Sequence, residues 1–144
     1  MVLRQKESKY FNFEVEKRIR DSALIASENL VRVLSFKALG TNCKIKVVSN
    51  SKNISSELFN DILYWISCFE SRYSRFLESS LICEINKQAG KNKVEINEED
   101  ETLFKLCDEM HFFSRGIFDP SSLPILKLWD YKNLSLIHIS EPTR

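Results

Sequence analysis

One carboxylate, Asp119, lies between residues that restrict its backbone and make it a candidate for binding a ligand. Pro120 follows it, and a proline moves the preceding residue away from the helical region into an extended conformation. Gly116 stands at the end of a helical pattern, where a left-handed residue commonly terminates the helix. We therefore expect Asp119 on a stiff turn beside the aromatic ring of Phe118. Such a turn is suited to binding a ligand through the Asp119 carboxylate. The alternative is a purely structural turn between two helices, in which Asp119 acts as a cap.

Three sequence blocks, in order along the chain, resemble one protein family. Gly116–Trp129 is similar to the Gly-x-Phe-Asp-(Pro/Val)-(Thr/Ser)-x-x-Pro-Leu-x-x-Leu-Trp signature of the FAD:protein FMN transferases, the ApbE family. Ala38–Asn42 resembles the Met-Gly-Thr-Thr opening of that family. Tyr73–Asn86 resembles its Ser-x-(Tyr/Phe)-x-x-x-Ser-Glu-(Leu/Ile)-Ser-x-(Leu/Ile)-Asn block. A short motif alone is a hypothesis, and the shared order of three blocks strengthens it.

The resemblance implies a reaction at a pyrophosphate. Family members transfer the FMN half of FAD onto a Thr or Ser hydroxyl of a target flavoprotein, which forms a phosphoester and releases AMP. Some members instead hydrolyse FAD to FMN and AMP. Catalysis of this kind depends on positioning and on charge neutralisation by Mg²⁺. The implied substrate is FAD, and the sequence does not identify the acceptor protein. A module that binds FAD or FMN without chemistry, and a structural domain without a ligand, remain as alternatives.

The resemblance also assigns candidate flavin contacts. Leu39 stands where the family commonly has a Met beside the flavin, and Phe76 stands at an aromatic position that can stack on a ring system. Ile117, Phe118 and Asp119 match the segment that grips FAD. A carboxylate repels a pyrophosphate, so Asp119 is expected to accept hydrogen bonds from ribose or base groups, with a position behind a metal ion as the less favoured alternative. The structural alternatives are capping of a strand turn for Leu39 and core packing for Phe76. No catalytic residue is assigned.

The chain also departs from the family pattern. Leu81 replaces the Glu of the Ser-Glu pair, and Cys83 replaces the Ser that follows it. The family's Mg²⁺ ligands belong to an Asp-x-x-x-Thr type segment, which this sequence does not contain, so we expect an inactive chain whose metal ligands lie in a missing C-terminal half. Residues 134–144 resemble a translated sequencing adapter. The expected division is an unassigned N-terminal extension at 1–30, the N-terminal part of a flavin transferase domain at 31–133, and an artefactual tail at 134–144.

The composition predicts a soluble globular protein. The 144 residues are 43% hydrophobic and 28% charged, and the net charge of +1 gives no reason to expect a nucleic-acid partner. No apolar stretch is long enough for a membrane span. The N-terminus has neither the apolar core of a secretion signal nor a lipid-accepting cysteine, which predicts a cytoplasmic protein or a wrongly assigned start codon. The four cysteines lack metal-ligand spacing, so no metal site is expected. Cys68 and Cys107 are predicted to be buried free thiols.

Hydrophobic periodicity predicts an α+β fold with strands packed on helices. Alternation predicts strands at Val31–Ala38 and Cys43–Val48, with a hairpin-like connection between them. A helical period begins at Ser55 or Ser56, either of which can act as the N-cap, and continues to about Tyr73. Its predicted apolar stripe is Phe59, Ile62, Leu63, Ile66 and Phe69 or Glu70.

Three further elements are predicted from local patterns. A short helix is expected within Arg18–Asn29, and a short strand at Lys93–Ile96. Asn97 is expected to cap a helix that ends at Gly116, with the acidic residues at 98–101 stabilised by the helix dipole rather than binding a metal. Because a missing half would supply partner strands, we also expect exposed apolar surface and poor solubility of the isolated chain.

Overall fold

A computed structural model describes residues 9–49 and 51–122, and in this part of the chain there are four helices and one three-stranded sheet. The predicted α+β class is therefore confirmed. The chain divides into two units, Met1–Val94 and Glu95–Arg144, and each is described here by itself. None of the described helices is long and apolar enough to span a membrane. The predicted tail at 134–144 lies outside the described residues, as does the signature beyond Ser122.

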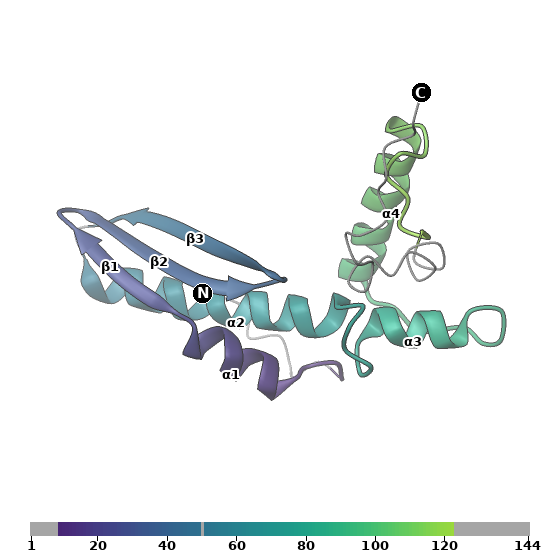
Figure 1. The fold of residues 1–144 in the computed structure, drawn as a ribbon, viewed down its shortest axis with the longest axis horizontal. Coiled ribbons are helices and arrows are strands. Elements are labelled where there is room, and N and C mark those ends of the chain that lie inside the picture. Colours follow the sequence, from purple (N-terminus) through teal and green to yellow (C-terminus); the bar gives the residue numbers. More distant parts are fainter. Residues whose placement is uncertain (1–8, 50, 123–144) are drawn as a thin grey trace, which may run out of the picture. The chain divides into compact units, whose positions relative to one another are not determined.

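The sheet of the first unit is an antiparallel meander (Figure 1). Its strands are β1 at Leu24–Glu28, β2 at Val31–Ala38 and β3 at Thr41–Val48. Each strand pairs with its neighbour through a two-residue turn, so that Glu28 pairs with Val31 and Ala38 with Thr41. The strands predicted in β2 and β3 are confirmed, with β3 starting at Thr41 rather than at Cys43.

Helix α1 begins earlier than the sequence pattern suggested. It spans Phe13–Asp21 and is capped by Asn12, whose side chain accepts hydrogen bonds from the first turn. The helix predicted within Arg18–Asn29 is wrong, because β1 occupies the second half of that range. Ser22 lies at the change from helix α1 to strand β1. Its hydroxyl donates to the Ile19 carbonyl at 2.7 Å and accepts the Lys37 N–H at 2.9 Å. The helix thus ends where the chain joins the sheet.

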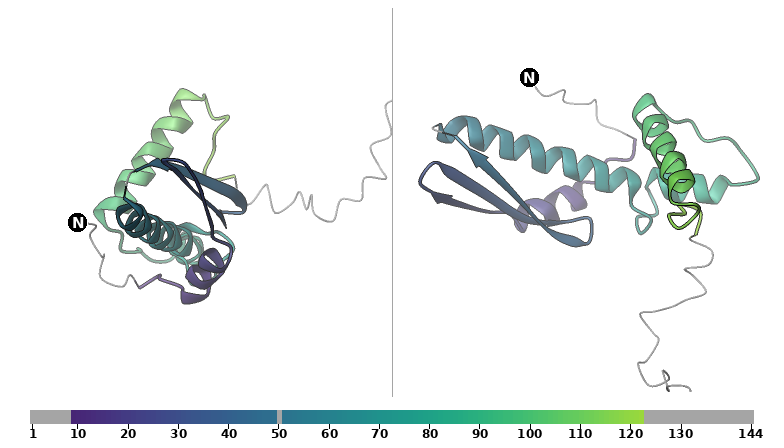
Figure 2. Two further views of the ribbon diagram at one scale, coloured as in Figure 1. Left: turned by 90° about the vertical axis from the view of Figure 1, so that its left-hand side faces the viewer. Right: turned by 90° about the horizontal axis from the view of Figure 1, so that it is seen from above.

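Helix α2 runs from Lys52 to Tyr73 and lies beside α1, and both helices cover the same face of the sheet (Figure 2). Its predicted end is confirmed. The predicted N-cap is wrong: Ser51 caps the helix by accepting the Ile54 N–H, whereas the Ser55 hydroxyl lies inside the first turn and donates to the Lys52 carbonyl at 3.1 Å.

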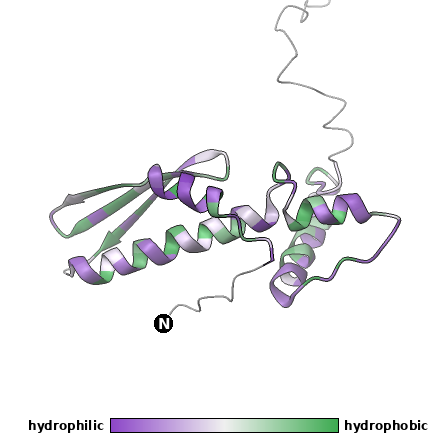
Figure 3. Ribbon diagram, turned by 90° about the horizontal axis from the view of Figure 1, so that it is seen from below, coloured by the Kyte–Doolittle hydropathy of each residue, from purple (hydrophilic) through white to green (hydrophobic). Residues whose placement is uncertain are grey.

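The core of the first unit lies between this sheet face and the two helices. Figure 3 shows hydrophobic and hydrophilic residues alternating along α2, as expected for a helix with one buried side. Along that side the predicted Phe59 and Leu63 are buried, but the stripe continues through Ser67 and Ser71. These small side chains let α1 approach, and the Asn12 N–H donates to the Ser71 hydroxyl at 3.3 Å. The buried core cluster is Val15, Ile19, Leu34, Phe36, Ala38, Phe59 and Leu63.

Helix α3, at Leu81–Gln88, closes the loop that follows α2. Ser80 caps it by accepting the Cys83 N–H at 3.1 Å, and the same hydroxyl donates to the Ser74 carbonyl at 2.6 Å. Ser80 and Leu81 are fully buried. The loop at 74–80 is therefore held at both ends.

The second unit contains α4, at Glu98–Phe113. The predicted cap is confirmed as a capping box, in which Asn97 and Asp100 each accept the backbone N–H of the other. The strand predicted at Lys93–Ile96 is wrong, because these residues pair with no strand in the described part of the chain. On α4, Leu106, Met110 and Phe113 expose about half or more of their surface.

The four cysteines, Cys43, Cys68, Cys83 and Cys107, are partly buried and form no disulfide. The prediction of thiols rather than disulfides at Cys68 and Cys107 is confirmed, whereas the prediction that they are buried is wrong, because both are only partly buried.

Replacing Phe59 tests the core. Phe59→Ala removes a fully buried ring and should lower the free energy of unfolding by about 3–5 kcal/mol. Leu58→Ala, which changes a neighbouring residue that is 39% exposed, is the matched control and should cost far less. Urea denaturation followed by circular dichroism measures both. Equal losses would contradict the placement of the core.

Candidate functional site

A groove of about 720 Å³ opens where the C-terminal end of α2 meets α1 and the turn between β2 and β3. It brings together Leu39 and Phe76, which come from separate blocks of the sequence. The lining residues are Asn12, which caps α1, then Glu14, Val15 and Arg18 of α1, Leu39 and Gly40 of the turn, Phe69, Glu70 and Tyr73 of α2, and Ser74, Arg75, Phe76 and Leu77 of the following loop.

Leu39 occupies an unusual backbone conformation at the edge of this groove. Its φ is +54° and that of Gly40 is +73°, so both turn residues are left-handed. Tight hairpins of this type favour Asn-Gly, because a side chain with a Cβ is strained at positive φ. A left-handed residue with a Cβ costs about 1–2 kcal/mol. The Leu39 side chain is 47% exposed, so burial in the core does not explain why a leucine occupies this position.

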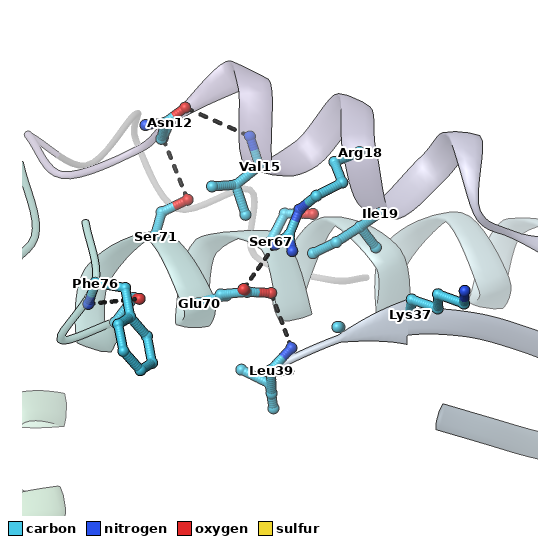
Figure 4. Close-up of polar contacts among 12 residues, drawn as sticks. Asn12, Val15, Arg18, Ile19, Lys37, Leu39, Ser67, Glu70, Ser71 and Phe76 are labelled. Atoms are coloured by element: carbon cyan, nitrogen blue, oxygen red, sulfur yellow. Dashed lines mark hydrogen bonds and ion pairs between the residues drawn. The ribbon is translucent and has the colours of Figure 1, made fainter. Parts of the chain in front are cut away.

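Glu70 connects this turn to both helices (Figure 4). The Leu39 N–H donates to Glu70 Oε2 at 2.9 Å, and Arg18 Nη2 donates to Glu70 Oε1 at 2.6 Å. The helical period of the sequence marks Glu70 only as a possible member of the apolar stripe and predicts no role for its carboxylate. The sequence feature that could have revealed this role is the position of Glu70, one helical turn after Ile66 on the apolar stripe. An acidic side chain on a buried helix face needs a polar or charged partner.

Aromatic rings form one wall of the groove. Trp65, Phe69 and Tyr73 follow one another along α2, with ring centroids 5.6 Å and 4.8 Å apart. Of these, Phe69 and Tyr73 line the groove. Beyond them, Phe76 is 72% exposed and the Arg75 guanidinium lies 4.7 Å from its ring centroid. The wall offers flat apolar surface of the kind on which a ring system stacks.

The loop holds Phe76 out of the core. Its N–H donates to the Ser74 hydroxyl at 3.2 Å, and the Ser74 carbonyl accepts the hydrogen bond from Ser80. Leu77, the next residue, packs against the core cluster instead. The alternative in which Phe76 is a core residue is therefore wrong, and its ring is presented at the groove.

The other three predicted contacts lie on a single turn of the second unit. Ile117 is 91% exposed, Phe118 is 42% exposed, and Asp119 is partly buried. Asp119 Oδ1 accepts two hydrogen bonds, from the Ser121 hydroxyl at 2.7 Å and from the Ser121 N–H at 2.8 Å. These bonds, that of the hydroxyl first, hold the pKa of the Asp119 carboxyl below its ordinary value.

His111 of α4 and Ser114, the residue that caps the C-terminal end of α4, fix this turn. His111 Nδ1 lies 2.8 Å from the Phe118 carbonyl oxygen, and the Ser114 hydroxyl accepts the Phe118 N–H at 2.9 Å. The predicted left-handed Gly116 is confirmed at φ +82°, although Arg115 before it is already left-handed at φ +54°. No local pattern in the sequence marks His111 for this role.

The described residues offer no place for a metal ion. Across 9–49 and 51–122, no group of three or more His, Cys, Asp or Glu side chains converges in a way that holds one. The acidic first turn of α4 contributes its Asp100 side chain to the helix cap. Mg²⁺ therefore does not fit this part of the chain, and no reaction step is assigned to it here.

Comparison with known families agrees with the sequence blocks. The model of the ApbE family matches residues 39–143, and the chain belongs to this family. Neither the curated proteins nor the solved structures gave a match. The matched range begins at Leu39 and includes Phe76 and Asp119, while α1, β1 and β2 precede it.

The strained turn makes a prediction about stability. Leu39→Asn should raise the free energy of unfolding by up to about 1 kcal/mol, because Asn tolerates positive φ better than Leu. Leu30→Asn is the matched control: Leu30 also lies in a hairpin turn and is 55% exposed, but it lacks a positive φ, so it should give no gain. Thermal unfolding of both variants measures the difference. If the Leu39→Asn variant were less stable than the wild type, the proposal that Leu39 is strained at positive φ would be contradicted.

The Asp119 turn should depend on pH. A carboxyl group whose pKa is lower in the folded chain stabilises it above the ordinary pKa, and this contribution is lost as the pH falls through the folded value. Ser121→Ala should raise the Asp119 pKa toward the ordinary value, as measured by NMR titration of the carboxyl carbon. Ser122→Ala, which keeps the hydrogen bond from the Ser122 N–H to the Asp119 carbonyl, should leave the pKa unchanged. Equal titration curves for the two variants would refute this.

Proposed function

We propose that this chain is part of a flavin transferase that moves FMN from FAD onto a Thr or Ser hydroxyl of a target flavoprotein and releases AMP. Membership of the ApbE family supports flavin transfer in general. The observation that carries the finer proposal is the groove, which places Leu39 and Phe76 on one surface although they come from separate family-like blocks.

The groove suits one ring system of FAD. Phe76 presents an exposed face, and Phe69 and Tyr73 continue the aromatic wall. An offset aromatic stack contributes about 0.5–1.5 kcal/mol beyond the area it buries. The Leu39 side chain adds apolar contact at the opposite edge. The lining also includes two arginines and two glutamates, so its formal charges cancel and aromatic stacking dominates recognition there.

Ile117, Phe118 and Asp119 are proposed as further FAD contacts on their own unit. Ile117 and Phe118 expose apolar surface. Asp119 Oδ1 is engaged by Ser121, and Oδ2 takes no hydrogen bond among the described residues. A carboxylate repels a pyrophosphate, so Oδ2 is proposed to accept a hydrogen bond from a ribose hydroxyl or a base N–H. An aspartate is already ionised at neutral pH, and the lowered pKa of Asp119 extends that ionised, accepting form to more acidic solution.

No chemical step is assigned to a residue of this chain. The reaction class needs charge neutralisation at the phosphates, and the sequence contains no Asp-x-x-x-Thr segment of the family type. We therefore expect the chain to bind FAD without releasing AMP, even when Mg²⁺ and an acceptor flavoprotein are supplied. Chromatographic detection of AMP above the protein-free background would contradict this part of the proposal.

Binding of FAD tests the function directly. Adding the 144-residue chain to FAD should quench flavin fluorescence, and Phe76→Ala should weaken binding about 2- to 10-fold because one ring stack is lost. Phe13→Ala is the matched control: Phe13 is 67% exposed on α1 and lies outside the groove lining, so its loss should leave the affinity unchanged. No quenching by the wild-type chain would contradict flavin binding, and equal effects of the two variants would contradict the groove as its place.

A further inference from the structure

We infer that Glu70 is a positioning residue for flavin binding, because it holds the Leu39 turn in its left-handed conformation at the edge of the groove. The inference rests on the proposed function for its ligand. Glu70 is not proposed to touch the reacting atoms. It acts through the backbone of Leu39.

The contacts of Glu70 are suited to holding the turn. Its side chain is 12% exposed, so the carboxylate is shielded from bulk water. One oxygen accepts the Leu39 N–H, and the other accepts from the Arg18 guanidinium, whose side chain is 55% exposed. Hydrogen bonds that involve an ionised group are shorter and stronger than neutral ones. Arg18 therefore fixes the rotamer of Glu70, and Glu70 fixes the turn.

The turn needs such an anchor because its own sequence disfavours its conformation. Without another interaction, Leu39 favours negative φ, and a change at this residue would alter the path of the chain between β2 and β3. Glu70, which accepts the hydrogen bond from the Leu39 N–H, lies near the C-terminal end of α2. Tyr73 lies on the same end of the helix, and Phe76 lies in the loop that follows it. Glu70 thus links the position of Leu39 to the end of α2 that precedes Phe76 (Figure 4).

The anchor extends to a helix that the family match does not include. Arg18 belongs to α1, whereas the match starts at Leu39. Asn12 and Val15 of the same helix line the groove. Residues before the matched range therefore contribute to the shape of the groove, through Glu70 and by direct lining.

The test replaces Glu70 in the 144-residue chain. Glu70→Ala should weaken FAD binding about tenfold. The variant removes the charged acceptor of the Leu39 N–H, and Leu39 is the residue proposed to contact FAD. Glu70→Ala should also speed hydrogen exchange of the Leu39 amide. Glu57→Ala removes the same charge from an exposed position on α2 and should change neither quantity. Affinities are measured by flavin fluorescence under conditions where circular dichroism shows each variant to be folded.

A conservative variant separates positioning from a loss of general stability. Glu70→Gln keeps an oxygen for the Leu39 N–H but loses the charge that pairs with Arg18, so it should lose stability while keeping FAD affinity within about threefold of wild type. If Glu70→Ala binds FAD as tightly as the wild type, or if Glu70→Gln binds as weakly as Glu70→Ala, the inference is overturned while the proposed function stands. If the wild-type chain binds no FAD, both fail together.

Discussion

The arrangement of the first unit depends on the burial of one sheet face. Leu34, Phe36 and Ala38 alternate along β2 and all point toward α1 and α2, where they meet Phe59 and Leu63. A three-stranded sheet of this size is stable only when a face is covered. Because two helices share that task, their ends converge beside the β2–β3 turn. The groove lies at this place, lined by residues of α1, of the β2–β3 turn, of the last turns of α2 and of the loop that follows.

Polar contacts then determine the details of the groove. Small serines on α2 allow α1 to approach, and one of them accepts the N–H of the residue that caps α1. Glu70 joins α1, α2 and the strained turn through two short hydrogen bonds. Strain at a position that core packing does not require is commonly found where a side chain serves a ligand. Leu39 matches that description, and its place in the family-like opening block agrees with it.

The Asp119 turn combines two interpretations that the sequence left as alternatives. Asp119 does cap a turn, because its carboxylate accepts from Ser121. The same contacts leave Oδ2 without a hydrogen bond among the described residues, and they lower the pKa of the carboxyl group. A cap and a ligand-binding acid are therefore compatible at one residue. His111 and Ser114 make the turn rigid from the helix side, which preorganises it for either role.

Local patterns in the sequence were sufficient for some features and not for others. The two strands, the cap at Asn97, the end of α2 and the identity of the family follow from alternation, capping chemistry and motif order, all of which act over a few residues. The end of α1, the existence of β1 and the absence of a strand at Lys93–Ile96 depended on whether a pairing partner lay nearby, and strand pairing is a property of the folded chain. The role of Glu70 and the exposure of Phe76 likewise arise from contacts between segments distant in sequence. Propensity does not encode such contacts, because a carboxylate or a ring has the same local preference whether its partner is water, a guanidinium or the N–H of a distant turn.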